Sequence, residues 1–143
     1  MGQASACPKE RVIHMLEVGI KGRIELTVDE SVSAKKAASG EMDVFGTPYV
    51  IALMEQTADK SVRPYLEEGC ATVGIAVNMH HTAATPMGMK AYAESELIEV
   101  DGRRLVFAIS VYDEVGQVAD CVHERFIIYK DKFMQKTLSR GKE

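Results

Sequence analysis

The residue that most invites a chemical interpretation is Glu55, which lies in a segment with helical spacing. Its neighbours on the same helical face are all apolar, namely Ile51, Ala58, Val62 and Leu66. A carboxylate on such a face must be hydrogen-bonded, paired or placed at a cavity, because burying an unpaired charge is strongly unfavourable. It could serve as a general base or a nucleophile, and the alternative is a structural ion pair with a buried arginine.

His81 is the second residue that breaks an apolar pattern. It has the strand parity of Val73, Ile75, Val77 and Met79, whereas His80 falls on the opposite face. The small and polar run Thr82–Pro86 follows, which suits a strand end that opens on a cleft. The imidazole could therefore transfer protons, although a histidine in an apolar row is more often a core or rim residue.

Three further residues are candidates for a site. Arg125 lies on the last expected strand in a row of small and apolar residues, so it is either paired with a buried acid or directed at an anionic ligand. Gly74 in mid-strand indicates a bulge or the close approach of a ligand to the backbone. Thr47 precedes Pro48 and is suited to capping a helix, which by itself accounts for that residue.

Several other chemistries are disfavoured. Glu55 and Asp59 are one helical turn apart, but no second histidine–carboxylate pair completes a metal site with credible spacing. His80 and His81 are adjacent in a strand and point to opposite faces, so they cannot chelate one metal together. There is no glycine-rich phosphate loop and no G-x-S-x-G motif. The sequence predicts neither a metal nor a cofactor.

The elements that would position these residues follow from hydrophobic periodicity. Residues 22–29 alternate as in a strand with one solvated face, and Ser31–Glu41 is typical of a loop or lid. A helix is expected from Thr47–Pro48 to about Leu66, with Gly69 as its stop signal. Its solvent-facing stripe has spacings of four, three and four, and consists of Gln56, Lys60, Arg63 and Glu67.

Four strands joined by short turns are expected after the helix. The second covers Lys90–Val100 and the last covers Gln117–Lys130, with Asp101–Gly102 as a two-residue hairpin turn. Short turns imply antiparallel neighbours. The predicted fold class is therefore α+β, in a hotdog architecture where a curved antiparallel sheet wraps along one buried helix, although an α+β sandwich of another topology fits the same pattern.

Length and composition indicate one globular domain. The chain has 143 residues, of which 46% are hydrophobic and 27% charged, with a formal net charge of −4. An acidic chain without tryptophan is a poor nucleic-acid binder, and no apolar run is long enough to span a membrane. Cys7, Cys70 and Cys121 are odd in number and widely spaced, which favours reduced thiols in a cytoplasm, two of them buried.

Four segments together resemble the fluoroacetyl-CoA thioesterase-like family of hotdog proteins. They are Val44-Phe-Gly-Thr-Pro-Tyr-Val-Ile-Ala-Leu-Met-Glu55, His81-Thr-Ala-Ala-Thr-Pro86, Gly102-Arg-Arg-Leu105 and His123-Glu-Arg125. The resemblance extends from about Met42 to Thr137. It implies an acyl-CoA thioesterase that acts as a homodimer, with its site at the subunit interface.

The resemblance also implies roles for individual residues. Thr47, Glu55 and His81 match the family's catalytic threonine, glutamate and histidine. Gly74 matches the position whose backbone N–H faces the thioester carbonyl, and Arg125 matches an arginine that supports the site. The family's fluoroacetyl-specific enzyme is similar but carries a phenylalanine-rich lid, whereas residues 31–43 contain no aromatic residue here. The expected substrate is therefore a different small acyl-CoA.

Two other functions and the domain limits complete the expectations. The same fold could serve as a non-hydrolytic acyl-CoA or small-acid binding module. It could also be a structural dimer in which Glu55 and Arg125 neutralise each other. We expect residues 1–11 to form a flexible tail, residues 12–137 to form the domain and residues 138–143 to form a second tail.

Overall fold

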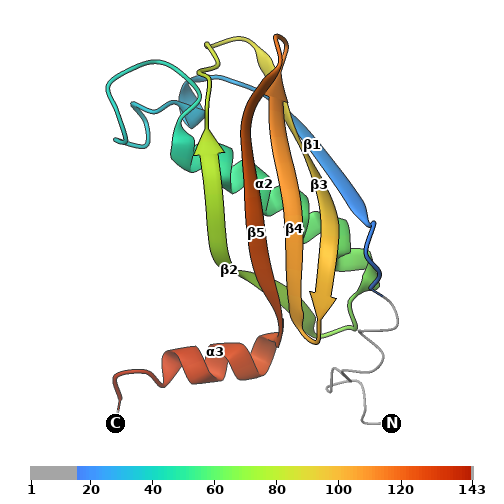
Figure 1. The fold of residues 1–143 in the computed structure, drawn as a ribbon. Coiled ribbons are helices and arrows are strands. Elements are labelled where there is room, and N and C mark those ends of the chain that lie inside the picture. The colour runs from blue at the N-terminus through green and yellow to red at the C-terminus, as the bar shows by residue number, and fades with distance from the viewer. Residues whose placement is uncertain (1–15, 143) are drawn as a thin grey trace.

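The computed structural model describes residues 16–142 (Figure 1). The helices and strands in chain order are β1 (Lys21–Thr27), α2 (Thr47–Val62), β2 (Cys70–His81), β3 (Lys90–Asp101), β4 (Arg104–Asp113), β5 (Gln117–Tyr129) and α3 (Lys130–Leu138). Two short 3-10 helices lie within the described residues, η2 (Glu30–Val32) and η3 (Arg63–Tyr65). The tail expected over residues 1–11 lies outside the described residues.

The five strands form one sheet in the order β1-β3-β4-β5-β2, and every neighbouring pair is antiparallel. Helix α2 runs along one face of this sheet (Figure 1), and their facing side chains form the core. The largest fully buried side chains include Phe45, Leu53, Met54, Leu97 and Phe107. The predicted α+β arrangement of a sheet along one buried helix is confirmed, with β1 and β2 as edge strands.

The bounds of α2 differ from the prediction at both ends. Gly46 is the N-cap and Thr47 is the first helical residue, so the prediction that Thr47 caps the helix is wrong. The helix ends at Val62 and continues as η3, because Pro64 lacks the N–H that a longer α-helix requires. Gly69, expected as the helix stop, instead has a φ of +91° just before β2.

A β-bulge divides strand β2 into two halves. Its register with β5 shifts between Gly74 and Ala76, which leaves Ile75 as the extra residue. The bulge expected at Gly74 is therefore present. It also reverses the side-chain parity, so the prediction that Val73 shares a face with Val77 is wrong, because alternation cannot continue through an inserted residue.

The hairpin between β3 and β4 lies one residue later than expected. Asp101 pairs with Arg104, so the turn residues are Gly102 and Arg103, and Gly102 has a φ of +62°. Beyond Tyr129 the chain forms α3, which the sequence analysis did not anticipate when it expected only strands after α2. This helix projects from the end of the sheet (Figure 1) and contains no buried residue.

Two of the three cysteines lie in the described region, and both are buried as expected. Cys121 carries a free thiol, and burial raises its pKa to about 12, with the charges of Asp120 and Glu55 acting in the same direction. Cys70 is disulfide-bonded, so the expectation of a reduced thiol is wrong at that position.

Candidate active site

Thr47 and His81 meet where the start of α2 adjoins the end of β2. Thr47 Oγ1 lies 2.7 Å from His81 Nδ1, so the threonine that the sequence suggested as a cap instead orients an imidazole. Burial lowers the pKa of His81, and an interaction with the backbone of Ala83 offsets this only in part. The neutral imidazole is therefore the favoured form near pH 7.

The second ring nitrogen of His81 is buried without a partner. Among the described residues, Nε2 makes no hydrogen bond although it is shielded from solvent. A buried polar atom without a partner is unfavourable, and one at the end of an edge strand is suited to meet a ligand or another subunit.

Glu55 lies on α2 against the bulge of β2. A Cβ atom added to Gly74 would be 2.8 Å from Glu55 Oε2, so only glycine leaves room for the carboxylate at this place. Glu55 is half-buried, and within residues 16–142 it forms no hydrogen bond and no ion pair. The carboxylate thus retains its capacity to accept a proton or attack an electrophile.

Arg125 reaches the same place from β5, but its charge is paired elsewhere. Its Nη2 lies 3.4 Å from Asp59 Oδ1, its Nε donates to Thr72 Oγ1 at 2.8 Å, and Nη2 also donates to the Thr72 carbonyl at 2.9 Å. Burial lowers the pKa of Arg125, opposed first by Asp59 and then by Glu55. The expected alternative in which Glu55 and Arg125 form an ion pair is not what the structure contains.

The structure thus collects the candidate residues into two groups. Thr47 and His81 form one, and Glu55, Gly74 and Arg125 form the other. Thr47 and Glu55 are eight residues apart on one helix, which corresponds to about 12 Å of rise, so the two groups lie at different levels along α2. Thr47 and Gly74 are exposed in the single chain, which leaves the site open along β2.

Two residues of the second group were missed by the sequence analysis. His123 is fully buried, with Cε1 3.2 Å from a Cβ added at Gly74, and Asp59 accepts from Thr72 Oγ1 at 2.9 Å besides pairing with Arg125. The positions of His123 and Asp59 in the sequence could have indicated both residues. His123 shares the strand face of Arg125, and Asp59 is one turn beyond Glu55 on the helix.

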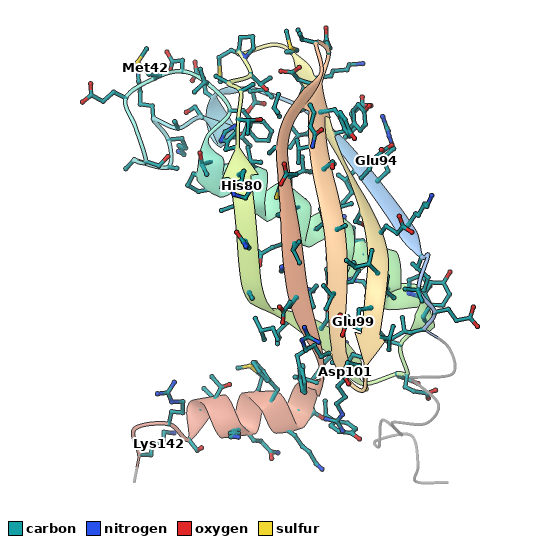
Figure 2. All side chains as sticks on the ribbon, in the orientation of Figure 1. Met42, His80, Glu94, Glu99, Asp101 and Lys142 are labelled. Atoms are coloured by element: carbon teal, nitrogen blue, oxygen red, sulfur yellow. The ribbon has the colours of Figure 1, made fainter. Side chains whose placement is uncertain are left out.

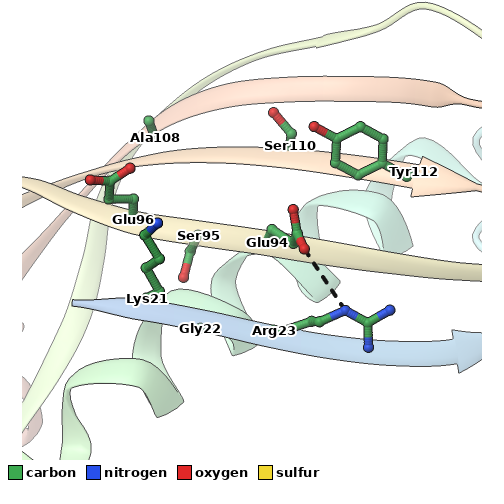
Figure 3. Close-up of a pocket in the computed structure, with 9 residues that line it drawn as sticks. All are labelled: Lys21, Gly22, Arg23, Glu94, Ser95, Glu96, Ala108, Ser110 and Tyr112. Carbon is green, nitrogen blue, oxygen red and sulfur yellow. Dashed lines mark ion pairs between the residues drawn. The ribbon is translucent and has the colours of Figure 1, made fainter. Parts of the chain in front are cut away.

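A hollow of about 500 Å³ on the other face of the sheet contains none of the predicted residues (Figure 3). It lies over β1, β3 and β4, and its charges are partly paired, with Arg23 Nε 3.9 Å from Glu94 Oε2. His80, labelled in Figure 2, adjoins His81 but belongs to the opposite face of β2, where its Nδ1 lies 3.5 Å from Asp120 Oδ1.

The described part of the chain contains neither a metal-binding cluster nor a membrane-spanning helix. No group of three or more histidine, cysteine, aspartate or glutamate side chains there could hold a metal ion. No helix over residues 16–142 is long and apolar enough to cross a membrane.

An antiparallel sheet wrapped along one helix, with an unpaired carboxylate over a glycine of the edge strand, defines a hotdog-fold protein with a candidate catalytic site. Comparison with known proteins narrows this class. The sequence model of the family described as "Fluoroacetyl-CoA-specific thioesterase" matches residues 28–131. The chain belongs to this family of thioester hydrolases.

Individual relatives agree with this assignment. A fluoroacetyl-CoA thioesterase of Streptantibioticus cattleyicolor is 39% identical over 94 residues, which cover 66% of this chain and 68% of that protein. A crystal structure of a mutant fluoroacetyl-CoA-specific thioesterase matches with a TM-score of 0.81 at 31% identity, covering 90% of this chain and 98% of the other. A hot-dog-like protein from Thermanaerovibrio acidaminovorans shares the fold, with a TM-score of 0.82 at 23% identity over 90% of this chain and 95% of its own.

Proposed function

We propose that this protein is an acyl-CoA thioesterase that hydrolyses a small acyl-CoA thioester to a free acid and CoA. The observation that carries the proposal is the half-buried carboxylate of Glu55, which lies against Gly74 with no partner among the described residues. Membership of a thioesterase family supports the reaction class.

The residues divide the chemical work as thioester hydrolysis requires. Glu55 either removes a proton from water as that water attacks the carbonyl carbon, or attacks the carbon itself to give an anhydride that water then cleaves. The backbone N–H at Gly74 stabilises the negative charge that forms on the carbonyl oxygen. In both routes the C–S bond breaks, and the departing sulfur of CoA takes up a proton.

Thr47, His81 and Arg125 assist. The hydrogen bond between Thr47 and His81 Nδ1 fixes the imidazole ring, which leaves Nε2 to polarise the carbonyl or to protonate the leaving sulfur. Arg125 keeps a positive charge near Glu55 without pairing with it, since its nearest carboxylate is that of Asp59.

We propose a homodimer that joins the two groups of residues across β2. This strand is twelve residues long, and within residues 16–142 it pairs with β5 alone. Ile75 on this strand is 52% exposed. An uncovered edge of this length is a template for pairing with a second copy. In an antiparallel pair about a two-fold axis between Gly74 and His81, the Glu55 of each chain would approach the His81 of its partner.

The acyl group proposed is small, and it differs from fluoroacetyl. Related structures are described with fluoroacetate and with acetyl-CoA. The loop before α2, residues 31–43, contains no aromatic side chain, so it supplies no phenylalanine lid over the acyl group. A cytoplasmic location, where acyl-CoA esters are made and consumed, remains part of the proposal.

Hydrolysis is tested by measuring thiol release from a panel of short, branched and aryl acyl-CoA esters. Glu55→Gln should lower kcat by about 10² to 10⁴, the usual contribution of a general base. The melting temperature of this variant should equal that of the wild type, because Glu55 has no hydrogen-bond partner among the described residues. Glu96→Gln, at an exposed carboxylate on β3 that lines the hollow on the other face of the sheet, is the matched control and should behave as the wild type.

Two outcomes would decide against the proposal. Wild-type activity in Glu55→Gln on every cleaved ester would remove Glu55 from the mechanism. Saturable binding of acyl-CoA in calorimetry, without turnover, would instead identify a binding module.

A further inference from the structure

His123 is a buried titratable group that the reaction scheme leaves unused. It lies on β5 with no exposed surface, two residues before Arg125 and therefore on the same face of the strand. Its Nδ1 is 2.8 Å from the carbonyl oxygen of Ala76, and its Nε2 is 3.1 Å from Arg125 Nη1. Both ring nitrogens are thus engaged beside Gly74.

The partners of His123 fix its protonation state. A carbonyl oxygen can only accept, so Nδ1 carries the proton that is donated to Ala76. A guanidinium can only donate, so Nε2 accepts from Arg125. The ring is therefore neutral, in agreement with a pKa that burial lowers, with Arg125 acting in the same direction.

The bond to Ala76 lies at the β-bulge. Ile75 is the residue left without a partner when the register shifts between Gly74 and Ala76. A bulge disrupts the local ladder, and here the carbonyl that follows the extra residue accepts from the imidazole of the neighbouring strand. His123 consequently ties the bulge to the interior row of β5.

Asp59 contacts Arg125, which in turn contacts His123. The aspartate Oδ1 accepts from Thr72 Oγ1 and faces Arg125 Nη2, while Oδ2 accepts from Arg63 Nε at 2.9 Å. The side chain of Arg125 is only 8% exposed, and a buried positive charge without an acidic partner is strongly unfavourable. Because Asp59 provides that partner, Glu55 is left without an ion pair.

We propose that His123 and Asp59 are positioning residues for thioester hydrolysis. His123 fixes the bulge so that the backbone at Gly74 keeps its geometry, and Asp59 engages Arg125 so that the Glu55 carboxylate stays unpaired. This inference rests on the proposed roles of Glu55 and Gly74. Neither residue touches the reacting atoms.

Two substitutions of His123 separate its two hydrogen bonds. In His123→Asn the side-chain amide can replace Nδ1 and still donate to Ala76, whereas His123→Gln extends to the position of Nε2 and loses that bond. The asparagine variant should keep kcat within about tenfold of the wild type. The glutamine variant should lose about 10²-fold or more, as when an oxyanion donor is displaced, with little change in KM.

Amide hydrogen exchange at residues 74–76 provides a readout that does not depend on turnover. Exchange should be faster in His123→Gln than in His123→Asn, because only the former releases the bulge. Equal exchange and equal kcat in the two variants would overturn the role of His123. If the wild type cleaves no acyl-CoA, the proposed function fails, and the exchange comparison alone still decides whether His123 holds the bulge.

Asp59 is tested by charge. Asp59→Asn should lower kcat about tenfold, because the released guanidinium of Arg125 can then pair with Glu55, whereas Asp59→Glu keeps the charge and should retain most activity. Arg63→Gln, which removes only the contact of the outer oxygen, is the control and should match the wild type. Wild-type kcat in Asp59→Asn, or an equal loss in both Asp59 variants, would contradict the proposal.

Discussion

At the scale of single residues, the distribution of counterions decides which carboxylate is available for chemistry. Asp59 and Glu55 are one turn apart on α2, yet Asp59 lies 3.4 Å from Arg125 Nη2 while Glu55 forms no ion pair within residues 16–142. The Asp59 carboxylate therefore has a structural role, whereas the Glu55 carboxylate is available for reaction. A single helical face thus carries one structural acid and one candidate catalytic acid.

Gly74→Ala should impair catalysis more than stability. The added Cβ would lie 2.8 Å from Glu55 Oε2, which is the movable end of a side chain, so the carboxylate shifts while the backbone remains. We expect kcat to fall about 10²-fold or more, as for a misplaced catalytic group, with a change in unfolding free energy within about 1 kcal/mol. Kinetics and chemical denaturation measure the two effects.

Gly116→Ala is the matched control, since nothing lies within 4 Å of a Cβ at that position. It should change neither quantity. A Gly74→Ala enzyme with wild-type kcat would show that the carboxylate does not act from its place over β2.

The sequence predicted Glu55, His81 and Arg125 because each interrupts an apolar row. It could not predict their grouping, since a row does not reveal which partner lies across the sheet. His123 was passed over because, beside Arg125 in a buried row, it resembles an ordinary core histidine. Asp59 was considered only as a metal ligand together with Glu55. Its pairing with Arg125 depends on how α2 packs against the sheet.

At the scale of elements, the bulge in β2 explains why the apolar face predicted for this strand is wrong. Alternation of Val73, Ile75, Val77 and Met79 predicts one apolar face, but Ile75 is an inserted residue and the parity reverses there. Gly74 signalled the irregularity without giving its effect on the residues that follow. Helix α3 was not anticipated, and none of its residues is buried, so it has no core-facing apolar face of the kind that predicts a helix.

Ile75→Asp should dissociate the proposed dimer. The change places a charge on the uncovered edge strand, where pairing with a second copy would desolvate it. Light scattering should give the mass of a monomer, or of a dimer whose dissociation constant is at least about tenfold higher than that of the wild type. Activity should fall in parallel if the site lies between subunits.

Ile98→Asp is the control for this substitution. Ile98 is 44% exposed and sits at the register shift of β3, a central strand, so it matches Ile75 in type, exposure and local geometry. It should leave the oligomeric state unchanged. A stable wild-type monomer would contradict the proposed interface.

At the scale of the whole molecule, the fully buried imidazole of His123 and the half-buried imidazole of His81 make the fold sensitive to acid. Burial lowers the pKa of both His81 and His123 from the ordinary value of 6.5. Below that value the unfolded chain binds protons that the folded chain does not, so stability is complete above it and declines as the pH falls. The melting temperature should drop by several degrees between about pH 7.5 and about pH 5.

His81→Gln should reduce this dependence, because one of the two titrations is removed. Asp113, whose pKa is lowered from 3.8 by hydrogen bonds from Thr85, Val115 and Gly116 that outweigh its burial, affects stability only at lower pH. A melting temperature that stays constant across the window would contradict the lowered pKa values of the two histidines.

Mixed dimers test whether each site draws on two subunits. Glu55→Gln and His81→Ala should each be inactive alone. When the two are mixed and allowed to exchange subunits, half of the dimers are hybrid, and each hybrid regains one intact site if Glu55 and His81 come from different chains. About a quarter of wild-type activity should return. No recovery after proven exchange would place both residues of a site on one chain.

The interior position of Cys121 has a practical consequence for anyone who studies this protein. With a pKa raised to about 12 by burial, that sulfur stays protonated at neutral pH and is a poor nucleophile. It should resist alkylation and should not exchange with CoA disulfides. Colorimetric reagents that detect CoA as it is released should therefore be consumed by the product and not by this cysteine.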